Sequence, residues 1–385
     1  MLKQIEGPWE KDPLKHYIRL KGWAPACDYR KKVVREVLKQ DRQLRYFTFC
    51  GKGAKDVMVL NRNRIVPMSK RYGFSQVVFF ERDPDHLAEA LSALRGAFGF
   101  SQDFVKVVLD VETDPRAESP TVTLGGNTTA PPVNSVFAKQ IDASARDEFF
   151  SLFPFDIINL DLCGHLFVPS DRFPGNILKA VRRVLDLQKG DMKVGNVNYG
   201  SLSGFTLLFT TEVGPANLSS QYVDELKACL QDNIEGSVEL ASLLEKSTGC
   251  KSSEDLHNDN WEDFLIYALP KILIRQVLQM DWYVDDVHGI KVYKFQRPAK
   301  DGKPEYHMLH VVMQIERQNP PYGSRLTLVE PQAQAAYYNV IRDYFENGPE
   351  VISDSSLAGL IPSLNDDIAT IEANLKARRY YWTIK

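Results

Sequence analysis

The chain has 385 residues, of which 44% are apolar and 25% charged, and its net charge is −3. This composition is typical of a soluble globular protein with one large domain and additions, or with two domains. It excludes a collagen-like chain, a disordered chain and a chain coated in basic surface. The five cysteines do not have the spacing of a zinc knuckle or a redox pair, which predicts free thiols in a reducing compartment.

The sequence shows neither a signal peptide at its start nor an apolar run of roughly 18 residues, so we expect a cytoplasmic chain with no membrane partner. Residues 1–45 hold twelve Lys/Arg against six Asp/Glu. We expect residues 1–28 to form an irregular arm and residues 29–43 a helix. A basic arm on an acidic body can bind phosphate, which makes nucleic acid a candidate partner; a solvated helix face is the structural alternative.

A β-prone run over 46–50 leads into Gly51-Lys52-Gly53, and a helical pattern follows at once. Strand, glycine turn and helix in this order bring backbone amides and a helix N-terminus to a ligand. A plain tight turn is the alternative. The next apolar run, 76–83, is typical of a buried parallel strand and ends in Glu81 and Asp83, and a helix is expected over 84–98. An acid at this point of a βαβ unit is suited to holding a ribose.

A further strand is expected over 104–111, followed by a long loop insertion at about 111–135, rich in proline and glycine. The pattern resumes with a strand over 136–142 that ends in Asp142. After a short helix at 146–153, the strand over 155–161 carries Asn159 and Asp161 at its carboxyl end. Ligands gather at such ends in open α/β sheets; the alternative is a buried strand whose acid caps the next turn.

After residue 161 the sequence again predicts alternating helices and strands, followed by helices at the end of the chain. We expect helices over 171–187 and 218–235, a strand over 204–212 and a polar, loosely ordered stretch over 236–260. A helix that breaks or kinks at Pro270 follows, then an antiparallel pair over 290–295 and 307–315, and tail helices using residues 337–345 and 364–375. No metal site is predicted, because His307 and His310 point to opposite faces of a strand. The amphipathic tail helices are a candidate surface for a protein partner.

These elements predict an α/β fold: a doubly wound, mostly parallel sheet with a late antiparallel hairpin and helical terminal extensions. The expected divisions are a basic arm and helix (1–45), a Rossmann-like domain (46–320) and a helical C-terminal extension (321–385).

The order of elements resembles the class I S-adenosylmethionine-dependent methyltransferases over residues 30–320. The resemblance implies that S-adenosylmethionine is the cofactor and that the first glycine turn cradles its methionine part. It also implies a ribose site at Glu81 with Asp83 beside it, an adenine site at Asp142 and Ala143, and a substrate side at Asn159 and Asp161, which would orient an acceptor amine. The residues of the glycine turn are Phe49, Cys50, Gly51, Lys52 and Gly53.

Leu160-Asp-Leu-Cys-Gly164 is distantly similar to the Asp-Pro-Tyr-Gly type of segment in tRNA guanine-N2 methyltransferases, which implies a nucleic-acid or nucleotide-like acceptor. Here Leu162 and Cys163 replace the proline and the aromatic residue. Three hypotheses follow: such a methyltransferase, a catalytically degenerate version of the fold that serves as a binding or assembly subunit, or another nucleotide-binding Rossmann enzyme such as a nicotinamide-dependent one. Cys163 with His165 as a nucleophile and base is a minor alternative within the first.

Overall fold

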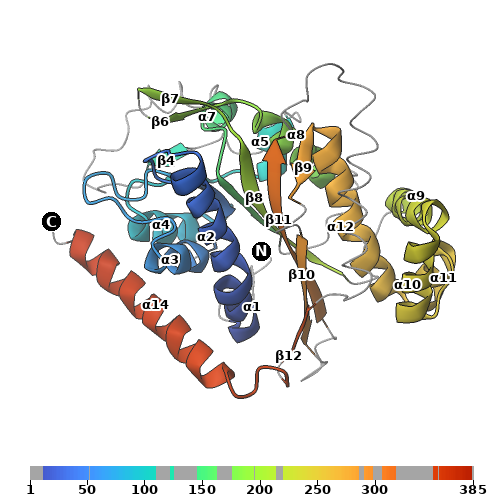
Figure 1. Ribbon diagram of the computed structural model, residues 1–385. Coiled ribbons are helices and arrows are strands. Elements are labelled where there is room, and N and C mark those ends of the chain that lie inside the picture. Colours follow the sequence, from blue (N-terminus) through green and yellow to red (C-terminus); the bar gives the residue numbers. More distant parts are fainter. Residues whose placement is uncertain are drawn as a thin grey trace, which may run out of the picture. The chain divides into compact units, whose positions relative to one another are not determined.

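A computed structural model describes residues 12–51, 53–109, 122–124, 145–162, 176–194, 196–213, 220–285, 290–297, 306–317, 350–353 and 355–383. The protein is a mixed α/β protein (Figure 1). Its chain divides into two compact units. Unit 1 comprises Met1–Asp161, Asp186–Leu202 and Ser355–Lys385, and unit 2 comprises Leu162–Leu185 and Ser203–Asp354.

The sheet of unit 1 is mostly parallel. Its strands lie in the order β5 (Ile157–Asp161), β1 (Tyr46–Phe49), β2 (Val77–Phe80), β3 (Phe98–Phe100) and β4 (Val122–Leu124). The first four run parallel and β4 runs antiparallel to β3. The expected strands at 46–50, 76–83 and 155–161 are therefore confirmed. Their apolar runs fit a central position, because such a strand is buried on both faces.

Helices contact both faces of this sheet. On one face, Asp56 of α3 (Lys55–Arg62) receives hydrogen bonds from Tyr46 and Thr48 of β1. On the other, Phe47 packs against Phe104 of α5 (Phe104–Leu109) and Phe149 of α7 (Ala145–Ser151), with ring centroids 5.9 and 5.3 Å apart. Between β2 and β3 the chain forms α4 (Pro84–Ala93), and after β5 unit 1 adds a hairpin of β6 (Asp191–Val194) and β7 (Val197–Ser201).

The N-terminal region is helical from Pro13 onward. It runs through α1 (Pro13–Ile18), the π-helical segment η1 (Arg19–Trp23), α2 (Ala24–Lys32) and the π-helical segment η2 (Val33–Val37). The expected irregular arm over 1–28 is thus wrong for residues 13–28, because Leu14, Ile18, Trp23 and Cys27 supply a fully buried apolar stripe at helical spacing. The helix α14 (Ile361–Thr383) packs against α1, α3 and α4 and completes unit 1.

Unit 2 contains the late antiparallel hairpin that the sequence predicts. Its strands are β12 (Glu350–Ser353), β10 (Ile290–Arg297), β11 (Tyr306–Arg317) and β8 (Gly204–Glu212), in that order, with β9 (Trp282–Val284) paired to β11. The strand β11 runs antiparallel to β8, β9 and β10. The helices of this part are α8 (Asn176–Leu187), whose last two residues belong to unit 1, α9 (Ser220–Gly236), α10 (Val238–Thr248), α11 (Ser253–Asp259) and α12 (Trp261–Gln279).

Two expectations are wrong within the described residues. Residues 104–109 form a helix rather than a strand, because Phe104, Val107 and Val108 are the buried positions, at spacings of three and four. The polar stretch 236–260 forms α10 and α11, in which the N-caps Ser237 and Ser252 each accept one amide of the first helical turn, from Leu240 and Asp255. At Pro270 the helix does not break, because α12 continues through it; the expected kink stays a prediction.

Other expectations fall outside the described residues. These are the strand over 136–142, the tail helix over 337–345, the turn between β10 and β11, and all of the insertion at 111–135 except Val122–Leu124. The expected domain limits at residues 45 and 320 remain predictions.

Candidate functional site

The carboxyl ends of β1, β2 and β5 lie at one edge of the unit 1 sheet, because the three strands are parallel. The glycine turn follows β1, Glu81 follows β2, and Asp161 closes β5. The register pairs Phe49 with Phe80, so Cys50 and Glu81 are the next residues on neighbouring strands. This edge therefore brings together the turn, the acid after β2 and the Asn-x-Asp pair.

The glycine turn is closed by a hydrogen bond from the Ala54 amide to the Gly51 carbonyl, at 2.9 Å. Ala54 has φ +41° and ψ +35°, a left-handed conformation that costs a residue with a Cβ about 1 kcal/mol. At Gly53 a Cβ would lie 3.2 Å from Cγ and Nζ of Lys55, so the Lys55 side chain lies back over the turn. The left-handed backbone of Ala54 lets α3 begin at Lys55, so that the first amides of the helix follow β1 after a short turn. A helix N-terminus placed in this way is suited to an anion or a polar ligand.

Behind the turn, four side chains form a buried polar cluster. The Oδ2 atom of Asp56 accepts hydrogen bonds from Tyr46 Oη and Thr48 Oγ1, both at 2.6 Å, and from Asn159 Nδ2 at 3.4 Å. Asn159 Nδ2 also lies 2.9 Å from Tyr46 Oη and 3.3 Å from Thr48 Oγ1. Burial, followed by the Asp56 charge, raises the pKa of Tyr46 well above its usual value, so Tyr46 stays a neutral donor. The cluster ties α3, and with it the glycine turn, to β1 and β5.

Asn159 is one of the two predicted catalytic residues, and it is fully buried with its amide nitrogen committed to this cluster. Its Oδ1 is buried and has no hydrogen-bond partner among the described residues. Because an unsatisfied buried acceptor costs about 1–3 kcal/mol, Oδ1 is the atom through which Asn159 could hold a ligand donor.

Asp161, the other predicted catalytic residue, is held by the N-terminal helix. Its Oδ2 lies 2.5 Å from Nζ of Lys15 on α1, and both side chains are largely buried, at 11% and 7% exposure. An acceptor amine at Asp161 would therefore meet a carboxylate already oriented by a lysine.

Among the predicted ribose residues, Glu81 and Asp83 have different surroundings. Glu81 is half-buried, and its Oε1 accepts the amide of Asp83 at 2.9 Å. Asp83 is the N-cap of α4 and accepts the amides of Asp85 and His86 through Oδ1. Its position is explained by helix capping, which leaves Glu81 as the better candidate for a ligand hydroxyl.

The residues predicted to bind the methionine part of the cofactor also differ in their burial. The half-buried Phe49 ring packs on Phe104 with centroids 4.9 Å apart, and Cys50 is fully buried. Gly51 and Gly53 are partly accessible. Lys52, Asp142 and Ala143 lie outside the described residues, so the predicted adenine site is not part of this geometry.

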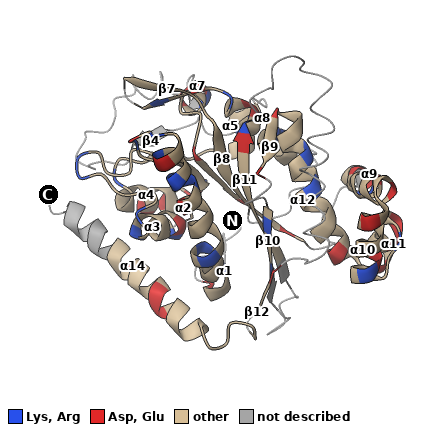
Figure 2. Cartoon of the chain, viewed as in Figure 1, with Lys and Arg blue, Asp and Glu red and all other residues tan. Residues whose placement is uncertain are grey.

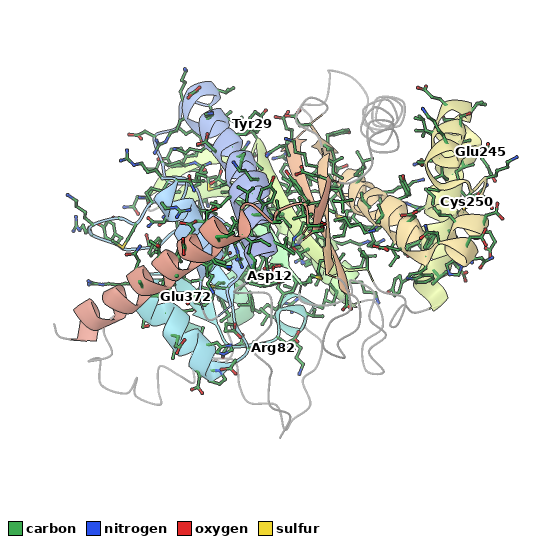
Figure 3. All side chains as sticks on the ribbon, turned by 90° about the horizontal axis from the view of Figure 1, so that it is seen from below. Asp12, Tyr29, Arg82, Glu245, Cys250 and Glu372 are labelled. Carbon is green, nitrogen blue, oxygen red and sulfur yellow. The ribbon has the colours of Figure 1, made fainter. Side chains whose placement is uncertain are left out.

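Helix α14 is attached to the site by two acids. Oε1 of Glu372, which Figure 3 labels, lies 3.1 Å from Nζ of Lys55, the first residue of α3. Asp367 pairs with His16 of α1 at 2.7 Å and with Arg62 of α3. The hydrogen bond from Arg62 lowers the pKa of Asp367, and burial lowers that of His16. The tail helix is therefore attached to α1 and to α3, the helix that follows the glycine turn.

The sequence interpretation missed Lys15, Tyr46, Thr48 and Asp56. Two features of the sequence could have indicated three of them. Lys15 stands between Leu14 and Ile18, which are buried at helical spacing. Tyr46 and Thr48 are two positions apart, so they share one face of β1, and Thr48 is paired with Asn159. A further buried cation, Arg19, lies one turn after Lys15, and within the part of the chain that the structure describes its Nε and Nη1 have no hydrogen-bond partner.

The structure defines a mixed α/β protein in which a strand, a glycine turn and a helix follow one another at this sheet edge. A model of the PP_RS20740-like family matches residues 138–333, half of the chain, and the chain belongs to that family. No curated protein and no solved structure matches the chain. Within the described part of the chain, no helix has the length and apolarity needed to cross a membrane.

Proposed function

We propose that the protein binds S-adenosylmethionine at the carboxyl ends of β1 and β2 and transfers its methyl group to a nucleic-acid or nucleotide-like acceptor. The observation that carries the proposal is the β1–β2 register, in which Glu81 follows Phe80 directly beside the glycine turn that follows Phe49. A carboxylate next to a strand–turn–helix is the arrangement that holds a ribose hydroxyl pair beside a polar cofactor tail. The antiparallel strand β11 of unit 2 agrees with the resemblance to class I methyltransferases.

In this proposal the turn supplies positioning rather than acid–base chemistry. A sulfonium is already a good leaving group, so the protein gains most by aligning acceptor and methyl group. Glu81 would accept the ribose hydroxyls, the amides after Gly53 would bind the carboxylate end, and Asp161, oriented by Lys15, would accept a hydrogen bond from the acceptor amine. Two exposed cations of the N-terminal helices, Lys21 and Arg35, are available for acceptor phosphates, whereas Lys32 is paired with Asp28.

Isothermal titration calorimetry with S-adenosylmethionine and S-adenosylhomocysteine tests the cofactor. We expect binding that Glu81→Ala weakens about tenfold or more, since a hydrogen bond to a charged group contributes about 1.5–3 kcal/mol. The matched control is Glu235→Ala, an exposed acid on α9 of unit 2. Absence of binding at millimolar ligand would reject the cofactor, and equal affinity of wild type and Glu81→Ala would reject the ribose assignment.

A second function has its own support. Asn159 is committed to internal hydrogen bonds and Asp161 to Lys15, which is what a degenerate site that keeps only a binding role would contain. In that case the chain would act as a binding or assembly subunit. The apolar stripe of α14, formed by Leu364, Ile368, Ile371 and Leu375, is buried, so the partner surface would lie elsewhere. Cofactor binding without transfer to any RNA or DNA acceptor would favour this second function.

A further inference from the structure

The segment between α3 and β2 carries an uncompensated positive charge. Residues 57–80 contain Arg62, Arg64, Lys70 and Arg71 and no Asp or Glu, in a chain whose net charge is −3. Residues 61–75, here named the basic loop, hold all four cations, and Figure 2 shows blue on this loop between α3 and β2. The loop is therefore a local exception to the charge balance of the protein.

Three of these cations are available to a partner. Arg62 is neutralised by Asp367, whereas Arg64, Lys70 and Arg71 are exposed and form no ion pair within the described part of the chain. The largest exposed ring of the loop is Tyr72, at 59% exposure, and the Arg71 guanidinium lies 5.1 Å from its centroid. Cations interleaved with an exposed aromatic ring suit a strand that offers phosphates and bases together.

The tip of the loop is held in one shape by its own hydrogen bonds. Ser69 and Gly73 exchange backbone hydrogen bonds at 2.8 and 3.0 Å, and the Ser69 hydroxyl accepts the amides of Arg71 and Tyr72. The Asn61 side chain accepts the Met68 amide at 2.9 Å. Residues 69–73 thus form a closed turn that presents Lys70, Arg71 and Tyr72.

Two glycines with positive φ hold this turn against the chain before β3. At Gly73 (φ +64°) a Cβ would lie 1.9 Å from the Arg95 carbonyl, and at Gly96 (φ +86°) a Cβ would lie 2.2 Å from the Tyr72 carbonyl. Side chains are excluded at both positions. The turn is consequently preorganised, which reduces the entropy lost when a partner binds.

We propose that the basic loop is a contact surface for single-stranded nucleic acid, in which Arg64, Lys70 and Arg71 bind backbone phosphates and Tyr72 stacks on a base. This surface is separate from the basic residues of the N-terminal helices. Binding requires no cofactor, so it succeeds or fails independently of the S-adenosylmethionine site. Only the assignment of the bound strand as the methyl acceptor rests on the proposed function.

Fluorescence anisotropy with a labelled 20-nucleotide single-stranded RNA, over a series of salt concentrations and without cofactor, tests the proposal. Each phosphate contact to a single strand contributes about 0.7 to the slope of log K against log salt. The triple variant Arg64→Gln, Lys70→Gln, Arg71→Gln should therefore lose about 2 from that slope. Tyr72→Ala should weaken binding about fivefold or more, and Tyr72→Phe should bind as wild type.

The matched control removes the same charge from three exposed lysines of unit 2: Lys179→Gln, Lys246→Gln, Lys291→Gln. It should leave the slope nearly unchanged. If the two triple variants lose equally from the slope of log K against log salt, the effect is one of net charge and the proposed site is overturned. Wild-type binding by the loop variant would overturn it too. Binding of phosphatidylserine vesicles but not RNA would assign the loop to a membrane surface instead. Circular dichroism checks that each variant is folded, and the Tyr72→Phe and Tyr72→Ala pair distinguishes stacking from folding.

Discussion

Asn159 on β5 and Tyr46 on β1 are joined directly, side chain to side chain: Nδ2 of the asparagine lies 2.9 Å from the tyrosine oxygen. Both residues are fully buried, and both contact the carboxylate of Asp56 at the start of α3. The strand that ends in the predicted substrate residues and the strand that ends in the glycine turn are therefore held at a fixed relative position by a polar contact.

Replacing Asn159 with alanine should lower the free energy of unfolding by about 2–3 kcal/mol, because buried polar partners are left unsatisfied and a small cavity forms. Urea unfolding at pH 7.5 measures this change. Asn258→Ala, at an exposed position of α11, is the control and should change stability by less than about 0.5 kcal/mol. Equal stability of the two variants would show that the cluster is not a structural tie.

Replacing Lys15 with methionine should destabilise the protein by about 3 kcal/mol, because it leaves the Asp161 carboxylate largely buried without its lysine. The double variant Lys15→Met, Asp161→Leu should recover much of that loss, since both charges are then removed. Thermal unfolding of the two single variants and the double variant gives the coupling energy. Lys21→Met, at an exposed position of η1, is the matched control. Additive effects of the two substitutions would contradict a paired role.

Replacing Ala54 with glycine should stabilise the protein by up to about 1 kcal/mol, although glycine normally destabilises. Ala54 has φ +41°, where a Cβ is strained and glycine is not. Ala241→Gly, inside α10, provides the contrast and should cost about 1 kcal/mol. Differential scanning calorimetry compares the two variants. A loss of stability of the same size in both would mean that the turn is not strained at Ala54.

Stability should fall as the pH drops below about 6.5, the ordinary pKa of histidine. Burial lowers the pKa of His16 in the folded protein, so the unfolded chain binds a proton in this range while the folded protein does not. The number of bound protons is then larger in the unfolded state, and the free energy of unfolding increases with pH. Urea titrations at pH 7.5, 6.5 and 5.5 should show this slope. His16→Gln should have a smaller slope, and an unchanged slope would attribute the effect to other groups.

The positions of the buried strands could be predicted from the sequence because their apolar runs are continuous. β1, β2, β5 and β8 were expected within a few residues of their bounds, and so was the pair β10 and β11. The prediction was wrong at Phe104–Leu109, where a run of valines suggested a strand but only one face is buried. It was also wrong for α1 and the start of η1, where Lys15, His16 and Arg19 interrupt the apolar pattern of the sequence. These three side chains are nevertheless buried.

The candidate site could be predicted as an edge of the sheet, but its contacts could not be predicted. The glycine turn and Glu81 follow from local patterns along single strands. The hydrogen bonds among Tyr46, Asp56 and Asn159, and the pair of Lys15 with Asp161, join residues more than 100 positions apart or on different elements. The spacing of residues along the sequence does not predict such contacts, because they depend on which strands become neighbours in the sheet.

The pairing of His16 with Asp367 joins residues 351 positions apart, with most of unit 2 encoded between them. During synthesis on the ribosome, the N-terminal helix must therefore wait for the whole of β8 to β12 to emerge before α14 arrives to cover it. Lys15, His16 and Arg19, which are buried in the folded protein, are accessible to water during this interval. A purely apolar helix would instead expose apolar surface that favours aggregation.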